Sequence, residues 1–301
     1  MSSQCLAIAT AQYPADLLPS LGAYRDKLAR WVAEAVDGGG QLLVFPEYGA
    51  MEWAGALGVS VAQDLTASLQ GVSDAMGEMD AALADLARRH GVHILGPSGP
   101  HVREGGQFAN AARLFAPSGR VGVQDKMIMT PFERDWGIAP GAQLRVFETA
   151  IGRIGIAICY DSEFPLLVRA QAEAGARLTL VPTCTEFPSG FHRVRTAALA
   201  RALENTSVSV LSPIIGDAPW SPAVDRNYGA GGIYVPAERT LSDTGIVAEG
   251  SPNVPGWIYG SVDFSRLEAL AADGEMRNRS DWSLQPGAKS AAAAVEIVSL
   301  L

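Results

Sequence analysis

One stretch in the middle of the chain constrains the fold more than any other, residues 153–165. It begins with apolar and small residues, Ile154 to Ile158, a run typical of a strand buried on both faces of a sheet. The run ends at Cys159, and a helical pattern follows Pro165, a residue that suits a first helical turn. The pattern therefore predicts a single thiol at a turn from a buried strand to a helix.

The predicted position of Cys159 suits a nucleophile. Asp161 or Ser162 is expected to cap the following helix. The helix dipole and free backbone N–H groups would favour the thiolate and hold a developing oxyanion. The alternative is a small buried hydrophobic residue, as most free cysteines are. The cysteine alone does not decide between these two interpretations.

Two other segments, residues 41–48 and 124–141, each place a charged residue just past a strand-like run. The first carries Glu47 after the sequence Leu-Leu-Val-Phe-Pro, and the second carries Lys126. Glutamate, lysine and Cys159, in this order and each within its own surrounding pattern, resemble the nitrilase superfamily of carbon–nitrogen hydrolases. One such motif would be a weak signal, whereas three in order with sensible spacing are specific.

The resemblance covers nearly the whole chain, from an opening strand at residues 7–12 to about Asp263. It implies a four-layer α-β-β-α sandwich, with mixed sheets inside and helices outside. Periodicity alone predicts only a one-domain α/β fold. We expect a hydrolase domain over residues 1–270. Residues 271–301, with Trp282 and an alanine-rich stretch at 291–294, form a tail that packs on its own domain or on a neighbouring subunit.

Local patterns predict the main elements along the chain. Strands are expected at residues 5–12, 42–45, 92–96, 178–182, 208–215, 229–235, 246–249 and 258–263, hairpins at 108–124 and 145–158, helices at 21–36, 75–90 and 192–205, a short helix from 267, and a loop at 48–58.

Composition excludes several classes of protein. Hydrophobic residues make up 48% of 301 and charged residues 18%, which favours a large core over disorder. The net charge of -9 argues against a nucleic-acid or anionic-membrane surface. Three cysteines, Cys5, Cys159 and Cys184, do not make a disulfide framework, and no zinc signature is present. The N-terminus resembles no signal peptide and no apolar run approaches the ~20 residues of a membrane span, so we expect a soluble cytoplasmic protein.

Cleavage of an unactivated amide requires a base, an oxyanion site and a nucleophile. Glu47 is assigned as the base that takes the thiol proton and later delivers it to the leaving nitrogen, and burial should raise its pKa. Lys126 and the backbone N–H of Tyr160 are expected to stabilise the oxyanion. The resemblance implies the same three roles, with a thioester acyl-enzyme that water hydrolyses. No metal or organic cofactor is called for.

Glu133 is a fourth candidate for the catalytic site. Superfamily members often carry a second glutamate shortly after the lysine, thought to position the lysine or the substrate, and Glu133 fits this spacing. Alternatively, Glu133 is a solvated carboxylate in a loop or an ion-pair partner of Arg134. Glu52 is a weaker candidate for the role of the second glutamate.

Cys184 is a rival nucleophile, because it also follows a buried strand. Its loop more simply borders the pocket, with Thr183, Cys184, Glu186 and Phe187 as substrate-binding candidates. Residues 201–205, Arg-Ala-Leu-Glu-Asn, resemble a helix end found in the family and are interpreted as structural.

The residues after the nucleophile indicate which branch of the superfamily this chain resembles. True nitrilases typically have Trp-Glu there, whereas this chain has Tyr160-Asp161, which looks like the amidase-type branches. We therefore expect hydrolysis of a small linear amide with release of ammonia or amine. The alternatives are an N-carbamoyl amide hydrolase, then a nitrilase, a catalytically idle binding or assembly module, and a redox-sensing protein with Cys184 as the resolving thiol. The resemblance also implies a homodimer or a larger homo-oligomer.

Overall fold

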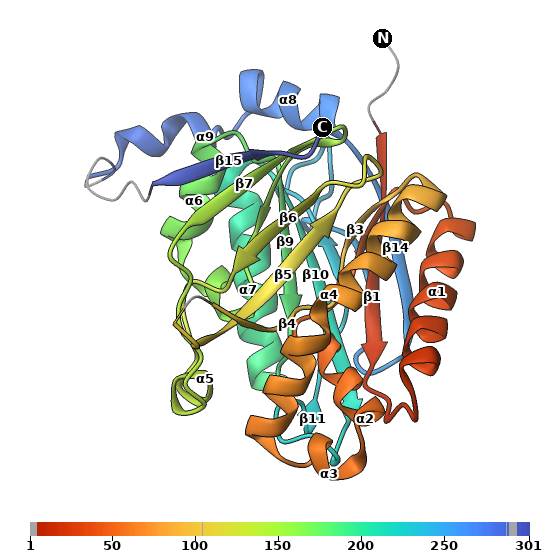
Figure 1. Cartoon of the computed structure of the whole chain (residues 1–301). Helices are drawn as coiled ribbons and strands as arrows, with labels where there is room; N and C mark the ends of the chain where they lie inside the picture. Colours follow the sequence, from red (N-terminus) through yellow and green to blue (C-terminus); the bar gives the residue numbers. More distant parts are fainter. Residues whose placement is uncertain (1–4, 104, 287, 289–293) are drawn as a thin grey trace.

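Two mixed β-sheets form the inner layers of the molecule (Figure 1). The structure is a computed structural model that describes residues 5–103, 105–286, 288 and 294–301. The first sheet contains β1 (Cys5–Pro14), β2 (Leu42–Val44), β3 (His93–Leu95), β4 (Gly99–Val102), β5 (Phe108–Phe115), β6 (Val121–Asp125) and β14 (Gly256–Asp263). The second contains β7 (Leu144–Thr149), β8 (Gly152–Ile156), β9 (Leu178–Thr183), β10 (Val208–Asp217), β11 (Arg226–Asn227), β12 (Gly232–Tyr234), β13 (Ile246–Glu249) and β15 (Val295–Ser299).

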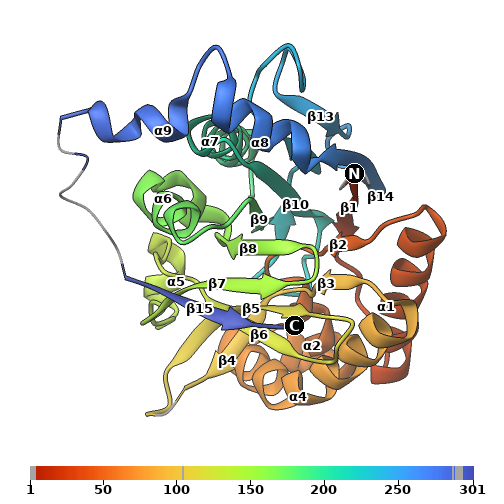
Figure 2. The ribbon, with the colours of Figure 1, turned by 90° about the horizontal axis from the view of Figure 1, so that it is seen from above.

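Helices cover the outer faces of both sheets (Figure 2). The α-helices are α1 (Leu21–Asp37), α2 (Trp53–Ala56), α3 (Val59–Ala62), α4 (Leu65–His90), α5 (Pro131–Asp135), α6 (Pro165–Glu173), α7 (Pro188–Asn205), α8 (Phe264–Asp273) and α9 (Asn278–Asp281). Within the described residues, 3-10 turns span Gly49–Glu52, Cys159–Glu163 and Trp282–Leu284. Helices α1 and α4 lie outside the first sheet, and α6 and α7 lie outside the second, so the four-layer sandwich is confirmed.

Among the residues that the structure describes, the two sheets join at the end of β1. There β1 pairs in parallel with β10 through only two residue pairs, Tyr13 with Ile214 and Pro14 with Ile215. Along the rest of its length β1 pairs with β14 and β2. The strand ladder therefore continues from one sheet into the other while the sheets stack face to face.

Side-chain alternation along β1 divides the interior into two cores. Ala9, Ala11 and Tyr13 belong to a cluster with α1 and α4, on the outer face of the first sheet. Leu6 and Ile8 belong to a second cluster that includes side chains from both sheets. This division follows from the two-residue period of a strand, which sends successive side chains to opposite faces.

Several elements differ from the sequence expectations, among them α4, residues 48–58 and β15. Helix α4 begins at Leu65, ten residues before the predicted start, because the Asp64 side chain accepts a hydrogen bond from the Ala67 N–H at 2.7 Å and caps it. Residues 48–58 are not the predicted loop, since a 3-10 turn and α2 occupy most of them. Strand β15 was not expected from the sequence.

The tail contacts its own chain. Strand β15 pairs in parallel with β7 at the edge of the second sheet, from Val295 beside Leu144 to Ser299 beside Glu148. The alanine-rich stretch lies outside the described residues except for Ala294. The division into residues 1–270 and 271–301 stays a prediction. Within the described part of the chain, no helix combines the length and apolar character needed to cross a membrane.

Candidate active site

Strand ends from both sheets position three charged or nucleophilic side chains. Glu47 follows β2 after Pro46, and Lys126 comes directly after β6, both in the first sheet. Cys159 begins the 3-10 turn that follows β8 in the second sheet. The site therefore depends on how the two sheets stack.

Lys126 lies between two buried carboxylates. Its Nζ is 2.7 Å from Glu47 Oε1 and 2.7 Å from Glu133 Oε2, and none of the three residues is more than 2% exposed. Burial lowers the pKa of Lys126, but the charges of Glu47 and Glu133 outweigh burial and raise that pKa well above its usual value. The lysine is therefore a fixed cation.

Glu133 is held ionised by its partners. Burial raises the pKa of Glu133, but Lys126 and hydrogen bonds from Thr130 and Tyr48 bring that pKa below its usual value. Its Oε2 accepts hydrogen bonds from the Thr130 N–H and hydroxyl, both at 3.0 Å, as part of the capping box that starts α5. Its Oε1 accepts from the Tyr48 hydroxyl at 2.9 Å.

The pKa of Glu47 is shifted in the opposite direction from the pKa of Glu133. Burial raises its pKa, and the Glu133 charge adds to that effect against the lowering influence of Lys126, so the net shift is upward, as the sequence predicts. Its Oε2 accepts a hydrogen bond from the Cys184 N–H at 2.9 Å. Two carboxylates on one lysine thus differ in proton affinity, and Glu47 is the better proton acceptor.

The thiol of Cys159 is buried and protonated at rest. Burial and the nearby Glu47 charge raise the pKa of the thiol well above its usual value, although Lys126 lowers it. The thiol donates a hydrogen bond to the Cys184 carbonyl, with 3.7 Å between sulfur and oxygen. The backbone of Cys159 has a φ of 47°, in the left-handed region that side chains rarely adopt.

The expectation that a helix N-terminus favours the thiolate is wrong. Helix α6 starts at Pro165, six residues after Cys159, and only a 3-10 turn lies between them. Neither Asp161 nor Ser162 caps α6, whose N-cap residue is Phe164. Cys159 is therefore not in the first turn of α6, and the pKa of its thiol is raised rather than lowered.

Asp161 instead fastens the lysine segment to the nucleophile turn. Its carboxylate accepts hydrogen bonds from the N–H groups of Met127 at 3.1 Å, Ile128 at 2.8 Å and Ile158 at 3.2 Å. Burial raises the pKa of Asp161 to about 7, despite the lowering influence of Lys126 and these N–H donors. Ser162 donates its hydroxyl to the Cys159 carbonyl at 2.7 Å.

Of the four substrate-binding candidates, Cys184 lies nearest to the chemistry. Its backbone contacts Glu47 and Cys159, and its thiol donates to Asn227 Oδ1 at 3.2 Å. Thr183 is buried and donates to the Ser212 carbonyl at 3.4 Å. Glu186 and Phe187 are exposed, and the guanidinium of Arg226 lies 5.5 Å from the Phe187 ring. The half-buried Tyr160 packs its ring edge-on against Phe164.

Sequence reasoning missed Asn110. This fully buried side chain of β5 donates Nδ2 to Glu47 Oε1 at 3.0 Å and to Glu133 Oε1 at 3.3 Å. Its Oδ1 accepts the Ser98 hydroxyl at 2.8 Å. The available signal was an amide in the middle of an apolar strand, which requires a hydrogen-bond partner when it is buried.

Glu52, the competitor of Glu133, belongs to a different cluster. Its Oε1 is 2.5 Å from the buried Lys27 Nζ, and its Oε2 accepts the Tyr13 hydroxyl at 2.7 Å. Burial raises the pKa of Glu52 to about 7, against the lowering influence of Lys27. The cluster fastens the 3-10 turn after Glu47 to β1 and α1.

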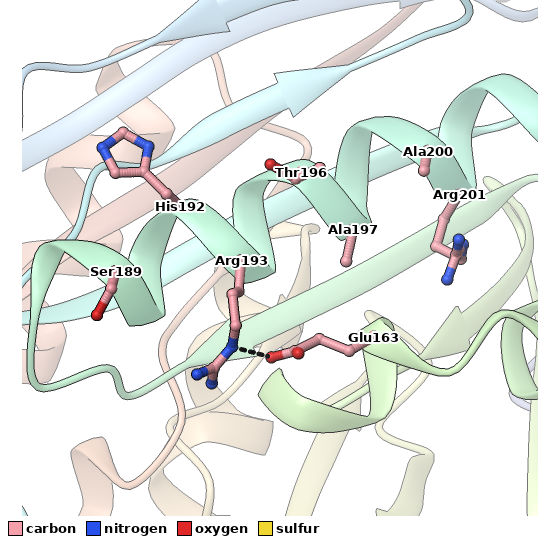
Figure 3. A pocket seen from close by; sticks show the side chains of 8 residues that line it. All are labelled: Glu163, Ser189, His192, Arg193, Thr196, Ala197, Ala200 and Arg201. Carbon is pink, nitrogen blue, oxygen red and sulfur yellow. Dashed lines mark hydrogen bonds and ion pairs between the residues drawn. The ribbon is translucent and has the colours of Figure 1, made fainter.

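An open pocket of about 510 Å³ lies between the nucleophile turn and α7 (Figure 3). Its lining does not include Glu47, Lys126 or Cys159, so it is separate from the site just described. Arg193 and Glu163 form an ion pair of 3.2 Å across it. Arg201 donates to the Ser162 carbonyl at 3.0 Å and pairs with Glu204 at 2.7 Å, which agrees with a structural role for residues 201–205.

Among the residues that the structure describes, no group of three or more histidine, cysteine, aspartate or glutamate side chains is arranged to hold a metal ion.

Known proteins resemble this chain over most of its length. A family model described as carbon-nitrogen hydrolase matches residues 7–209. The probable hydrolase YhcX of Bacillus subtilis is 34% identical over 278 residues, which cover 91% of this chain and 53% of the relative. Omega-amidase NIT2-B of Xenopus laevis is 25% identical over 198 residues, 62% of this chain and 68% of the relative. The chain spans about half the length of several curated relatives that it matches.

Solved structures share the fold at low sequence identity. A carbon-nitrogen hydrolase from Helicobacter pylori superposes with a TM-score of 0.73 at 18% identity, covering 90% of this chain and 93% of that one. Nit3 of Saccharomyces cerevisiae, a member of branch 10 of the nitrilase superfamily, gives 0.72 at 20% identity and covers 91% and 95%. From the matching family model, the extent of the relatives and the common fold, the chain belongs to the carbon–nitrogen hydrolase family of the nitrilase superfamily.

Proposed function

We propose that this chain is a cysteine-dependent amidase that hydrolyses a small linear amide through a thioester acyl-enzyme. The observation that carries the proposal is the pair of unequal carboxylates on Lys126, one raised and one lowered in pKa, beside a buried thiol. Such a separation assigns the proton acceptor to Glu47 and leaves Glu133 as the permanent anion that fixes the lysine.

The proposed reaction proceeds in two halves. Glu47 takes the proton of Cys159 as sulfur attacks the amide carbon, and the resulting oxyanion is stabilised by Lys126 Nζ and the Tyr160 N–H. Glu47 then protonates the nitrogen, the C–N bond breaks, and ammonia or amine leaves. Water, deprotonated by Glu47, attacks the thioester, and the acid and the free thiol are regenerated.

The residues after the nucleophile favour an amide over a nitrile, whereas relatives of both kinds match the chain. Tyr160 and Asp161 follow the nucleophile, in place of the Trp-Glu typical of nitrilases. Three relatives, 25–28% identical, are named omega-amidases, and a solved neighbour is an amidase from Nesterenkonia, with a TM-score of 0.66 and 22% identity. A relative from Lupinus angustifolius, 33% identical over 52% of this chain, is named a bifunctional nitrilase/nitrile hydratase, so nitriles belong in the test.

Ammonia release across a substrate panel tests the proposal. The panel contains aliphatic amides, ω-amides of dicarboxylic acids, N-carbamoyl amino acids and nitriles, with Cys159→Ala beside the wild type. Turnover of a linear amide that the variant lacks supports an amidase. Turnover confined to nitriles or N-carbamoyl compounds would show that the proposed substrate class is wrong, while the proposed catalytic residues would stand. No turnover and no acyl adduct on Cys159 would favour an idle module.

The homo-oligomer is proposed on the resemblance alone. Light scattering coupled to size-exclusion chromatography gives the mass in solution, and a mass equal to one chain at micromolar concentration would contradict it. The cytoplasmic location stays a prediction.

A further inference from the structure

The backbone of Cys184 contacts both the base and the nucleophile of the proposed reaction. Its N–H donates to Glu47 Oε2 at 2.9 Å, and its carbonyl accepts the Cys159 thiol, with 3.7 Å between sulfur and oxygen. A shift or rotation of this one residue would therefore change both contacts at once. The way in which Cys184 is held in place bears directly on how Glu47 and Cys159 are placed.

The side chain of Cys184 is held by a residue from a distant part of the sequence. Its thiol donates to Asn227 Oδ1 at 3.2 Å, and Asn227 lies in β11, 43 residues further along the chain. Burial, and then the charge of Glu47, raise the pKa of the Cys184 thiol well above its usual value. The thiol therefore keeps its proton and acts as a hydrogen-bond donor to Asn227.

Asn227 is itself fixed in a single orientation. The residue is only 2% exposed, and its Nδ2 donates to the Gly216 carbonyl at 2.9 Å and to the Val224 carbonyl at 2.8 Å. These two acceptors use both hydrogens of the amide group, so the amide oxygen is the atom that faces the Cys184 thiol. Backbone pairing with Gly216 joins Asn227 to β10 of the second sheet (Figure 1).

The residues on either side of Cys184 are attached to the same part of the second sheet. Thr183 is the last residue of β9, which pairs with β10. The Thr185 carbonyl accepts the Tyr228 N–H at 2.7 Å, and the Thr185 hydroxyl donates to the Tyr228 carbonyl at 2.7 Å. These contacts limit how far the backbone can shift, and the thiol contact with Asn227 fixes the orientation of Cys184 between them.

We infer that Asn227 is a positioning residue that acts through the Cys184 thiol to hold the backbone of Cys184 against Glu47 and Cys159. The inference rests on the proposed function, because Glu47 and Cys159 have their roles in the proposed amide hydrolysis. It assigns Cys184 a positioning role in place of a role as rival nucleophile or substrate contact. Rate is lost when a base and a nucleophile are slightly misplaced, even if both remain present.

Two substitutions at Cys184 distinguish a positioning role from a substrate contact. Cys184→Ala removes the donor to Asn227, so kcat should fall about fivefold or more while KM stays within about twofold. Cys184→Ser keeps a hydroxyl donor at the same place and should retain most of kcat. An equal loss of kcat in both variants, or an effect confined to KM, would overturn the inference.

The pH profile of Asn227→Ala tests the route from Asn227 to Glu47. Without its anchor, the Cys184 N–H donates less well to the Glu47 carboxylate, and loss of such a donor raises the pKa of a carboxyl group. The acid limb of kcat/KM should therefore move to higher pH, both in this variant and in Cys184→Ala. Asn205→Ala is the matched control, because Asn205 is also buried but bonds the Arg201 carbonyl. An acid limb that stays in place in both variants, or moves equally in the control, would contradict this route.

The double variant shows whether Asn227 acts through the Cys184 thiol. In the Cys184→Ala background, Asn227→Ala should lower kcat by a smaller factor than it does in the wild type, because the contact between the two side chains is already absent. If the two losses multiply in full, Asn227 acts by another route and the inference is wrong.

Hydrogen exchange of the resting protein tests the contact without any turnover. The Cys184 amide should exchange about fivefold faster or more in Asn227→Ala than in the wild type, whereas the amides of β14 in the first sheet should not change. Unchanged exchange at Cys184 would overturn the inference whatever the activity. Faster exchange in a protein whose wild type hydrolyses no amide would support the Asn227 contact and reject the proposed function.

Discussion

At the scale of single residues, the candidate site works by giving two similar side chains different proton affinities. Glu47 and Glu133 both contact Lys126 at 2.7 Å, and both are buried. Glu133 receives further hydrogen bonds from Thr130 and Tyr48, whereas burial dominates at Glu47. The number of donors around each carboxylate therefore decides which one serves as base.

The pH dependence of kcat/KM should follow Glu47. A base acts only when deprotonated, so activity should fall as pH decreases through a pKa above that of an ordinary glutamate, about 4.3. Glu47→Gln should lose about 10²-fold or more in kcat. If kcat/KM of the wild type falls only at a pKa equal to or below that of an ordinary glutamate, Glu47 is not the base. Substantial activity of Glu47→Gln would contradict the same assignment.

Asn110 should act as a positioning residue. Asn110→Ala removes the donor shared by Glu47 and Glu133, so kcat should fall about tenfold or more, with the acid limb of the pH profile displaced. Asn205→Ala is the control, because Asn205 is equally buried but bonds the Arg201 carbonyl. If both variants lose the same stability and neither shifts the acid limb of the pH profile, Asn110 stabilises the fold but does not position the two glutamates.

The sequence identified the reactive residue types better than it described their surroundings. Glu47, Lys126, Glu133 and Cys159 could be selected because each sits in a short local pattern. The pKa of Cys159 could not be foreseen, since it depends on burial between two sheets and on where α6 actually begins. Asn110 was missed because its partners lie 63 and 23 residues away in the chain.

At the scale of elements, the nucleophile turn and the lysine segment are one unit. Asp161 belongs to the turn, and it accepts the N–H groups of Met127 and Ile128, directly after Lys126. The position of the lysine relative to the thiol therefore depends on this one carboxylate.

Asp161→Asn should uncouple the two segments. The amide keeps only one acceptor oxygen, and its NH₂ group would face backbone donors, so about 1–3 kcal/mol of stability should be lost. We expect kcat to fall at least tenfold and the Met127 and Ile128 amides to exchange hydrogen faster. Asp135→Asn, at the exposed end of α5, is the control. Unchanged exchange at both amides would contradict the connection.

Elements with a clear hydrophobic periodicity could be predicted from the sequence, whereas short elements could not. The helix at α1 and the β5–β6 hairpin match the expected positions within about two residues. The first two turns of α4, Leu-Thr-Ala-Ser-Leu-Gln-Gly, contain threonine, serine and glycine, which have low helix propensity. Strand β15 is only five residues long, and its pairing with β7 is a tertiary event that its own residues do not specify.

At the scale of the whole molecule, the site requires both sheets. Glu47 and Lys126 follow strands of the first sheet, and Cys159 follows a strand of the second. The core between the sheets, which includes Phe147 and Leu300, keeps these strand ends together. The resemblance supplied this layering, because hydrophobic alternation alone does not show which sheet face meets which.

Weakening the inter-sheet core should therefore weaken the molecule and the site together. Phe147 is fully buried, and Phe147→Ala should lower the free energy of unfolding by about 3–5 kcal/mol. Activity and tryptophan fluorescence should be lost at the same urea concentration. Val121→Ala, at a partly exposed position of β6, is the control. Loss of activity well before unfolding would show that the sheets separate independently.

The central claim is that Cys159 carries the acyl group, and acid-quenched turnover followed by mass spectrometry tests it most directly. The account predicts that the wild type, quenched while hydrolysing an amide, gains the mass of the acyl group on the peptide of residues 154–169, whose one cysteine is Cys159. Cys159→Ala should neither gain this mass nor release ammonia. Turnover by the alanine variant, or an acyl group found on Cys184 instead, would contradict the account.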